Sequence, residues 1–139
     1  MTCEAIKHFG NRGEMFMNLR DVQKLLDATI LTGGELLDRT VETCCGSDLM
    51  SDVLAFTKRN TLLCTGLTNL QVVRTADMTD LCAIVVVRGK IPSEEVLEAA
   101  AENCLPILST ESTLFDTCGI LYKAGIRGCL KKECSYGRK

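Results

Sequence analysis

The strongest structural signal in the chain is the stretch 81–110, LCAIVVVRGKIPSEEVLEAAAENCLPILST. Residues 81–87 are consecutively apolar and rich in β-branched side chains, which is typical of a strand buried on both faces. A Gly/Pro turn follows, then a helix that begins after Ser93, and Pro106 precedes a second short apolar strand. This order predicts a β-α-β unit with parallel strands and a right-handed crossover.

Apolar periodicity predicts further elements on both sides of this unit. Helices are expected over 18–27, 48–56, 68–76 and 112–124. Strands are expected over 28–32, 61–64 and 126–130, and in a segment that ends at residue 45. The expected N-caps are Asn18 with Asp21, Ser47 or Asp48, Thr68 with Gln71, and Thr110 or Ser112. The last helix is expected to face inward with Leu114, Phe115, Cys118, Leu121 and Tyr122 and to end at Gly125. We therefore predict an α/β fold, a layered α/β/α domain with a largely parallel sheet of about five strands.

The length of 139 residues fits one domain. We expect an N-terminal arm over 1–16, the α/β domain over 17–128 and a basic tail over 129–139. The net charge of −2 and the pI near 5.4 argue against nucleic-acid and anionic-membrane surfaces. The sequence shows neither a signal-peptide core nor an apolar run long enough to cross a bilayer, so we expect a cytoplasmic location.

The sequence contains none of the common catalytic motifs. Gly89-Lys90 is followed by Ile91 and is not preceded by the glycine that a P-loop requires, and no G-x-G-x-x-G motif is present. The single histidine, His8, argues against a histidine-rich metal site or a Ser/His/Asp triad. We therefore expect a protein that is not an enzyme and that carries no cofactor and no metal.

The nine cysteines include no C-x-x-C pair, and we interpret most of them as small core residues with reduced thiols. Cys44 and Cys45 would approach Cys64 if their strands were neighbours, and Cys129 with Cys134 would close a site in the tail. The alternative hypothesis is therefore a cysteine-dependent redox or metal-handling accessory protein. A redox role for Cys44 or Cys45 requires a lowered thiol pKa.

Three loops follow the third, fourth and fifth predicted strands and lead into helices. If these strands are parallel, the loops open onto one edge of the sheet, where free helix N–H groups favour an anion. The residues that we expect to bind a ligand are Thr65, Gly66, Thr68, Asn69, Arg88, Gly89, Ser109 and Thr110. Hydroxyls, small residues and the cations of Arg88 and Lys90 suit a nucleotide or another phosphorylated ligand. The same residue types also occur in turns and caps, which is the purely structural interpretation.

Two segments carry a family resemblance. Leu37-Asp38-Arg39 leading to 48–55, and 83–87 followed by 92–110, resemble DRTGG-domain proteins in order and spacing, over about residues 17–126. Asp38 and Arg39 are present, whereas Thr43 and Cys44 stand where glycines are expected, so no close backbone contact is inferred at this loop.

The resemblance implies an α/β domain like the N-terminal domain of HPr kinase/phosphorylase, without its catalytic domain. Similar domains are fused to phosphotransacetylases, or to CBS domains in regulatory pyrophosphatases, where they take part in adenine-nucleotide regulation and dimerisation. The resemblance therefore implies a regulatory module that forms a homodimer and binds an adenine nucleotide, another phosphorylated molecule or a protein partner. The serine-kinase activity with which stand-alone copies are often labelled is not supported by this sequence.

Overall fold

A computed structural model describes residues 17–129 of the chain. The predicted arm over 1–16 and all of the predicted tail except Cys129 lie outside the described residues, and so do His8 and Cys134. Within the described part, no helix is long and apolar enough to cross a membrane.

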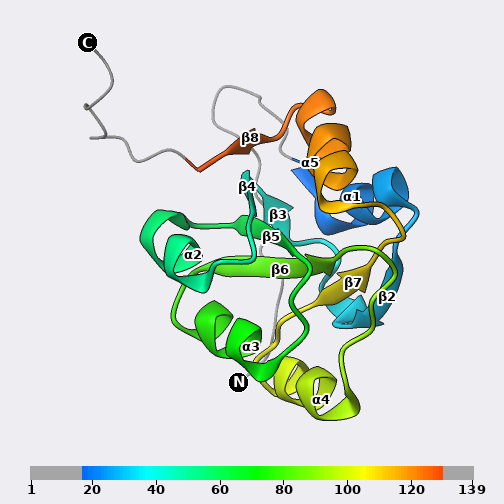
Figure 1. Cartoon of the computed structure of the whole chain (residues 1–139). Helices are drawn as coiled ribbons and strands as arrows, with labels where there is room; N and C mark the ends of the chain where they lie inside the picture. The colour runs from blue at the N-terminus through cyan, green and yellow to red at the C-terminus, as the bar shows by residue number, and fades with distance from the viewer. Residues whose placement is uncertain (1–16, 130–139) are drawn as a thin grey trace.

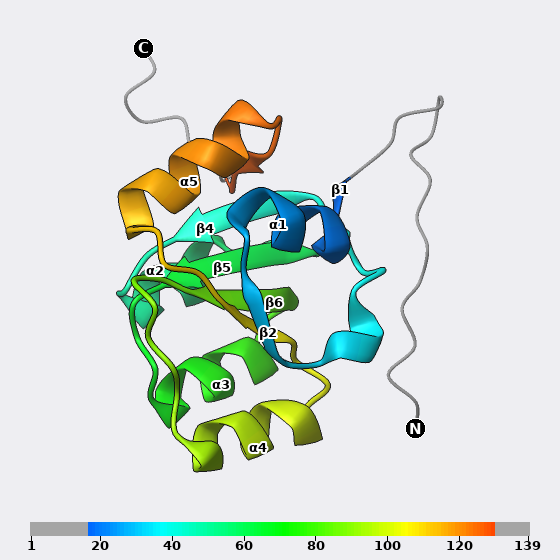
Figure 2. The same ribbon diagram turned by 90° about the vertical axis from the view of Figure 1, so that its right-hand side faces the viewer.

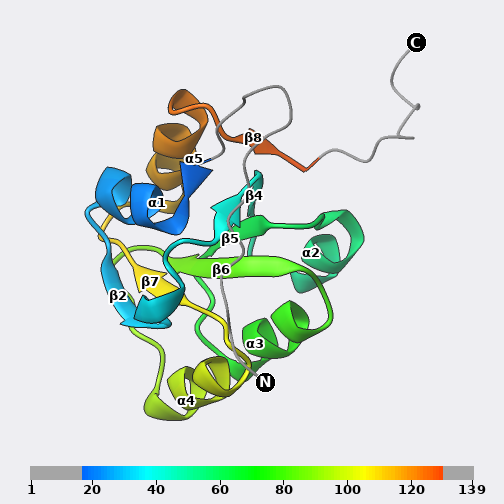
Figure 3. The same ribbon diagram turned by 180° about the vertical axis from the view of Figure 1, so that it is seen from behind.

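A six-stranded sheet forms the middle layer, with the strand order β2-β7-β6-β5-β4-β8 (Figure 1). Its strands are β2 (Thr29–Thr32), β4 (Thr43–Gly46), β5 (Thr61–Thr65), β6 (Leu81–Val86), β7 (Ile107–Ser109) and β8 (Arg127–Gly128). Strand β2 pairs with β7 in the antiparallel direction, and the other neighbours are parallel. Seen from behind, β2 and β8 lie at opposite edges (Figure 3). The predicted parallel β-α-β unit is confirmed, and the sheet has six strands where about five were expected.

Helices cover both faces of the sheet, as Figure 2 shows from the side. One face carries α1 (Leu19–Leu26) and α5 (Leu114–Lys123), and the other carries α2 (Met50–Phe56), α3 (Leu70–Asp77) and α4 (Glu94–Glu102). A short 3-10 turn, η2 (Gly34–Leu36), follows β2. The segment predicted as one strand ending at Cys45 divides into β3 (Thr40–Val41), which pairs with β1 (Met17–Asn18), and β4. The expected α/β/α layering is therefore present.

Strand β6 joins the two cores of the molecule. Ala83 and Val85 belong to the core beneath α1 and α5, whereas Ile84 and Val86 belong to the core with α2, α3 and α4. All four side chains are buried because successive residues of a central strand point to opposite covered faces. The consecutive apolar run in the sequence follows from this position.

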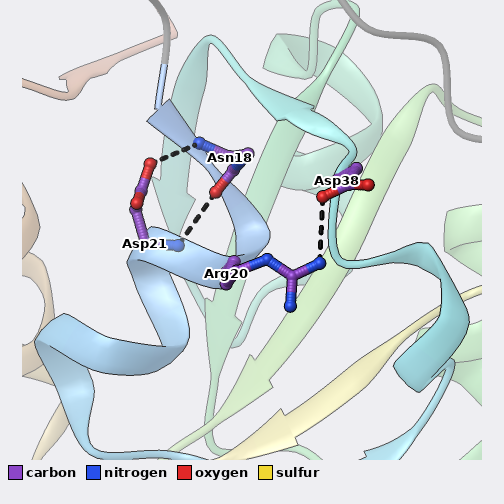
Figure 4. A network of polar contacts seen from close by, with 4 residues as sticks. All are labelled: Asn18, Arg20, Asp21 and Asp38. Atoms are coloured by element: carbon purple, nitrogen blue, oxygen red, sulfur yellow. Dashed lines mark hydrogen bonds and ion pairs between the residues drawn. The ribbon is translucent and has the colours of Figure 1, made fainter.

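The predicted N-cap of α1 is confirmed, and three other predicted caps are wrong. Asn18 Oδ1 accepts from the Asp21 N–H at 2.9 Å, and the Asp21 carboxylate accepts from the Asn18 N–H at 3.2 Å, which completes a capping box (Figure 4). The N-caps of α2, α3 and α5 are Leu49, Asn69 and Thr113, each one to three residues later than expected. Two of the expected caps, Asp48 and Thr110, bond instead to other segments.

The orientation of α5 also differs in part from the prediction. Leu121 is buried and Leu114 and Cys118 pack against the core, but Phe115 is 85% exposed and Tyr122 is 59% exposed. A helix turns about 100° per residue, so the stripe 114, 117, 118, 121 faces the sheet and its neighbours 115 and 122 point away. The buried position that Phe115 was expected to fill belongs to Thr117.

Candidate functional site

The loops after β5, β6 and β7 meet at one edge of the sheet, as expected for neighbouring parallel strands. Backbone bonds tie the second loop to the third: the Arg88 N–H donates to the Ser112 carbonyl at 2.8 Å, and the Gly89 N–H donates to the Thr110 carbonyl at 2.7 Å. Lys90 Nζ donates to the Gly66 carbonyl at 2.8 Å and so ties the second loop to the first. We call this edge, with residues 48, 65–69, 88–90 and 109–112, the rim.

Three of the predicted ligand residues are buried hydroxyls with partners inside the protein. Thr65 Oγ1 donates to Asp48 Oδ1 at 2.8 Å, Ser109 Oγ donates to the Lys90 carbonyl at 2.8 Å, and Thr110 Oγ1 donates to the Leu26 carbonyl at 3.0 Å. Each of these hydroxyls is at most 8% exposed at the residue level. These hydroxyls hold the loops in shape. Other groups of the rim face the solvent.

Arg88 is an exposed cation of the rim, in the loop after β6. Its backbone has φ +60°, and Gly89 follows with φ +66°, so the chain reverses sharply after β6. A Cβ atom on Gly66 would lie 3.3 Å from Arg88 Nη2, so the glycine leaves room for the guanidinium above the first loop. Arg88 has no ion pair within residues 17–129.

The start of α3 completes the rim on the other side. Asn69 occupies the N-cap position, is exposed, and makes no capping hydrogen bond with its side chain. Thr68, just before it, is half-buried. The first N–H groups of α3 therefore lack a side-chain acceptor from the cap, and the positive end of the helix favours an anion there.

Asp48 belongs to the rim, which the sequence interpretation missed by assigning it to a helix cap. Its Oδ1 accepts from the Gly66 N–H at 2.7 Å and from Thr65 Oγ1 at 2.8 Å. These two hydrogen bonds, with the nearby charges of Lys90 and Arg88, lower the pKa of the Asp48 carboxyl although partial burial opposes the shift. Only the strand order places Asp48 at the rim. Strand β4 lies beside β5, so the loop after β4 reaches the same edge of the sheet.

A cavity of about 570 Å³ lies at the opposite edge, near the amino ends of β5 and β6. Its lining includes Arg39, Arg59, Asn60, Asp77, Asp80 and Asn103. Arg39 Nη1 donates to the Cys82 carbonyl at 3.0 Å, and burial lowers the pKa of its guanidinium. Arg59 Nη2 lies 3.7 Å from Glu42 Oε2, and in this ion pair Arg59 is exposed whereas Glu42 is half-buried. The sequence interpretation did not identify this cavity, which provides a natural comparison for the rim.

The cysteines of neighbouring strands do come together. Cys44 Sγ and Cys64 Sγ are 3.6 Å apart, while Cys45 faces the other core. Cys129 Sγ contacts the hydroxyls of Thr43 and Thr61. Among residues 17–129, no group of three or more His, Cys, Asp or Glu side chains has a geometry that would hold a metal ion.

Residues 21–124 match a known protein family, the DRTGG domain. The fold is similar to a crystal structure of the CBS and DRTGG domains of the regulatory region of Clostridium perfringens pyrophosphatase, complexed with its activator diadenosine tetraphosphate. The TM-score is 0.63 and the sequence identity 14%, and the match covers 84% of this chain and 51% of that one. The chain thus spans about half the length of that structure. No curated protein sequence matches it significantly.

Proposed function

The chain belongs to the DRTGG domain family, and from this premise we propose that it is a non-enzymatic regulatory module that senses a nucleotide or another phosphorylated ligand at the rim. The observation that carries the proposal is the meeting of three loops around the exposed Arg88, beside the uncapped start of α3. The similar pyrophosphatase region, crystallised with diadenosine tetraphosphate, supports adenine nucleotides as the first ligands to test.

The charges of the rim favour a nucleotide over free phosphate. Arg88 and the first N–H groups of α3 suit a phosphate, because charge-assisted hydrogen bonds to guanidinium and amide groups are strong. Asp48 would repel a phosphate placed beside it. Both hydrogen bonds to Asp48 end on Oδ1, so Oδ2 remains able to accept from a ligand hydroxyl. A ribose phosphate carries both groups on one ligand.

The same contacts support binding rather than catalysis. The hydroxyl nearest to a carboxylate, that of Thr65, is fully buried and already donates to Asp48. The lowered pKa makes Asp48 a weaker base than a free carboxylate. The Thr65–Asp48 pair therefore suits holding a ligand rather than activating a nucleophile.

Isothermal titration with ATP, diadenosine tetraphosphate and inorganic phosphate tests the proposal. We expect an adenine nucleotide to bind and phosphate to bind more weakly. Arg88→Ala should weaken nucleotide binding about tenfold or more, because a charge-assisted hydrogen bond contributes roughly 1.5–3 kcal/mol. Arg59→Ala, which removes an exposed guanidinium from the opposite cavity, is the matched control and should leave the affinity unchanged.

Two results would overturn parts of the proposal. If none of the three compounds binds the wild-type chain, it does not sense ligands of this class. If a nucleotide binds and Arg59→Ala weakens it while Arg88→Ala does not, the ligand site is the opposite cavity and the rim is not involved.

Self-association is the second part of the proposed function, and the outer face of α5 supports it. Phe115 and Tyr122 are exposed on this face, and a shallow cavity of about 330 Å³ lies between Phe115, Gly119 and Ile120. A Cβ atom on Gly119 would meet no atom within 4 Å, so another helix could approach the backbone closely. These features suit a second copy of α5 as the occupant.

Charge placement along α5 favours an antiparallel pair related by a two-fold axis. Asp116 lies one turn before the centre of the face and Lys123 one turn after it, with Gly119 between them. In an isologous interface, residue i contacts residue j and j contacts i. Asp116 would therefore face Lys123 of the partner subunit, and each ion pair would occur twice.

A further inference from the structure

Three sulfur atoms converge between α5 and the sheet, in the core beneath α1 and α5. Cys44 Sγ and Cys64 Sγ are 3.6 Å apart on neighbouring strands. Cys118 Sγ lies over Gly46, where an added Cβ would come within 2.5 Å of it. Gly46 is the register partner of Cys64 and lies two residues from Cys44. The missing side chain at Gly46 therefore provides the space in which Cys118 meets the other two thiols.

The geometry points to a modification site: we propose that Cys118 is oxidised by hydrogen peroxide and then forms a disulfide with Cys44. This inference goes beyond the proposed ligand sensing and does not depend on it. Cys118 and Cys44 are partly exposed, whereas Cys64 is 0% exposed. A small oxidant thus reaches the first two sulfurs more readily than the third.

The strand pair alone is poorly placed for a disulfide. Cys44 is in register with Leu62, so Cys44 and Cys64 are diagonal neighbours on one face. Two residues along a parallel strand rise about 6.6 Å, and neighbouring strands lie about 4.8 Å apart, so diagonal Cα atoms lie roughly 8 Å apart. Disulfides usually require about 4.4–6.8 Å between Cα atoms. Cys118 comes from a helix above the strands, and its position depends on side-chain packing rather than on the ladder. The diagonal spacing of the ladder therefore does not limit a bond between α5 and β4.

The surroundings also distinguish the three thiols electrostatically. Hydrogen bonds from Cys44, and then from Cys64, stabilise the Cys118 thiolate and lower the pKa of Cys118. The pKa values of Cys44 and Cys64 are raised, mainly because each acts as donor to Cys118. The thiolate is the form that attacks peroxide, so Cys118 is the first thiol to react.

The Cys118 thiolate attacks one oxygen of hydrogen peroxide, the O–O bond breaks, and sulfenic acid and hydroxide form. Cys44 sulfur then attacks Cys118 sulfur, the S–S bond forms, and the S–O bond breaks. The hydroxyl group leaves with the Cys44 proton as water. Two thiols lose two electrons and one peroxide becomes two waters.

Peptide mapping by mass spectrometry after treatment of the reduced chain with one equivalent of hydrogen peroxide tests this inference. We expect a peptide pair linked through Cys44 and Cys118. Cys118→Ser should abolish the linked pair, and Cys44→Ser should leave a sulfenic acid at Cys118 that dimedone traps. Cys45→Ser is the matched control, because Cys45 is a strand neighbour that packs in the opposite core.

A second measurement uses the wild-type chain alone, so its result does not depend on whether a variant folds. Iodoacetamide at neutral pH should alkylate Cys118 at least about tenfold faster than Cys45, whose burial raises its thiol pKa to about 11. Equal rates for the two residues would overturn the inference. A peroxide-induced disulfide that lacks Cys118, or one that is also lost in Cys45→Ser, would overturn it as well.

Discussion

Asp48 shows how one exposed carboxylate orders two loops. It follows β4 but bonds to the loop after β5, through the Gly66 N–H and the Thr65 hydroxyl. Both donors stabilise the ionised form, which is why the pKa of Asp48 is lowered. A group whose folded-state pKa is depressed stabilises the fold above its unfolded value of 3.8, and the contribution disappears as the pH falls through the folded value.

Asp48→Asn should therefore change the pH dependence of stability. The free energy of unfolding of the wild type should exceed that of the variant by a constant amount above about pH 5, and the difference should shrink at lower pH. Its size should be at most about 1 kcal/mol, because the carboxylate is exposed. Urea titrations of both proteins between about pH 2.5 and 7 measure this difference. A gap that widens on acidification would contradict the assignment.

Gly33 is the second residue at which the structure allows a sharp test. Its φ is +81°, and an added Cβ would lie 2.6 Å from Pro106 Cα. Gly33→Ala should therefore lower the free energy of unfolding by roughly 2–4 kcal/mol, from backbone strain and overpacking together. Gly34→Ala is the control, because the added Cβ would meet only Ile30 Cγ2 at 3.8 Å. Equal melting temperatures for the two variants would refute this explanation.

At the scale of elements, two asparagines occupy equivalent N-cap positions with different contacts. Asn18 makes both bonds of a capping box at the start of α1, whereas Asn69 makes no side-chain cap bond at the start of α3. Asn18→Ala should therefore cost about 1 kcal/mol of stability, and Asn69→Ala only a few tenths. Chemical denaturation of the ligand-free proteins compares them. A larger loss for Asn69→Ala would show that the capping contacts are assigned wrongly.

The sequence predicted the elements whose signal is local. The run 81–87 and the helix after Ser93 could be identified because burial on both faces and capping leave a direct pattern in neighbouring residues. The N-caps of α2 and α5 could not be identified from the sequence. Asp48 and Thr110 have the right chemistry for a cap, but they bond to distant segments. The inward face of α5 was misassigned because Phe115 is apolar without being buried.

At the scale of the molecule, the sequence predicted only the part of the candidate site that follows from the direction of the strands. Parallel strands bring Thr65, Arg88 and Ser109 to one edge, which the β-α-β pattern implied. The places of Asp48 and Cys118 depend on which strands are neighbours and where α5 crosses them. Strand order is a non-local property, and no periodicity in the sequence records it.

The prediction for the whole molecule concerns its quaternary structure. If α5 pairs with itself, Phe115→Glu places a charge within the interface. The dimer should then dissociate while the fold remains intact, because Phe115 is 85% exposed in the single chain. Met78→Glu is the matched control, since Met78 is also apolar and 67% exposed but follows α3 on the other side of the sheet. Sedimentation velocity should show a dimer for the wild type and Met78→Glu, and a monomer for Phe115→Glu.

A charge exchange separates antiparallel pairing from any other use of this face. Asp116→Lys alone would place like charges opposite each other twice across the two-fold axis and should weaken the dimer. Adding Lys123→Asp to the same chain would restore both ion pairs and should recover the dimer, although each charge would then sit at the unfavourable end of the helix dipole of α5. A double variant that stays monomeric while folded, or a wild type that sediments as a monomer, would exclude pairing through α5.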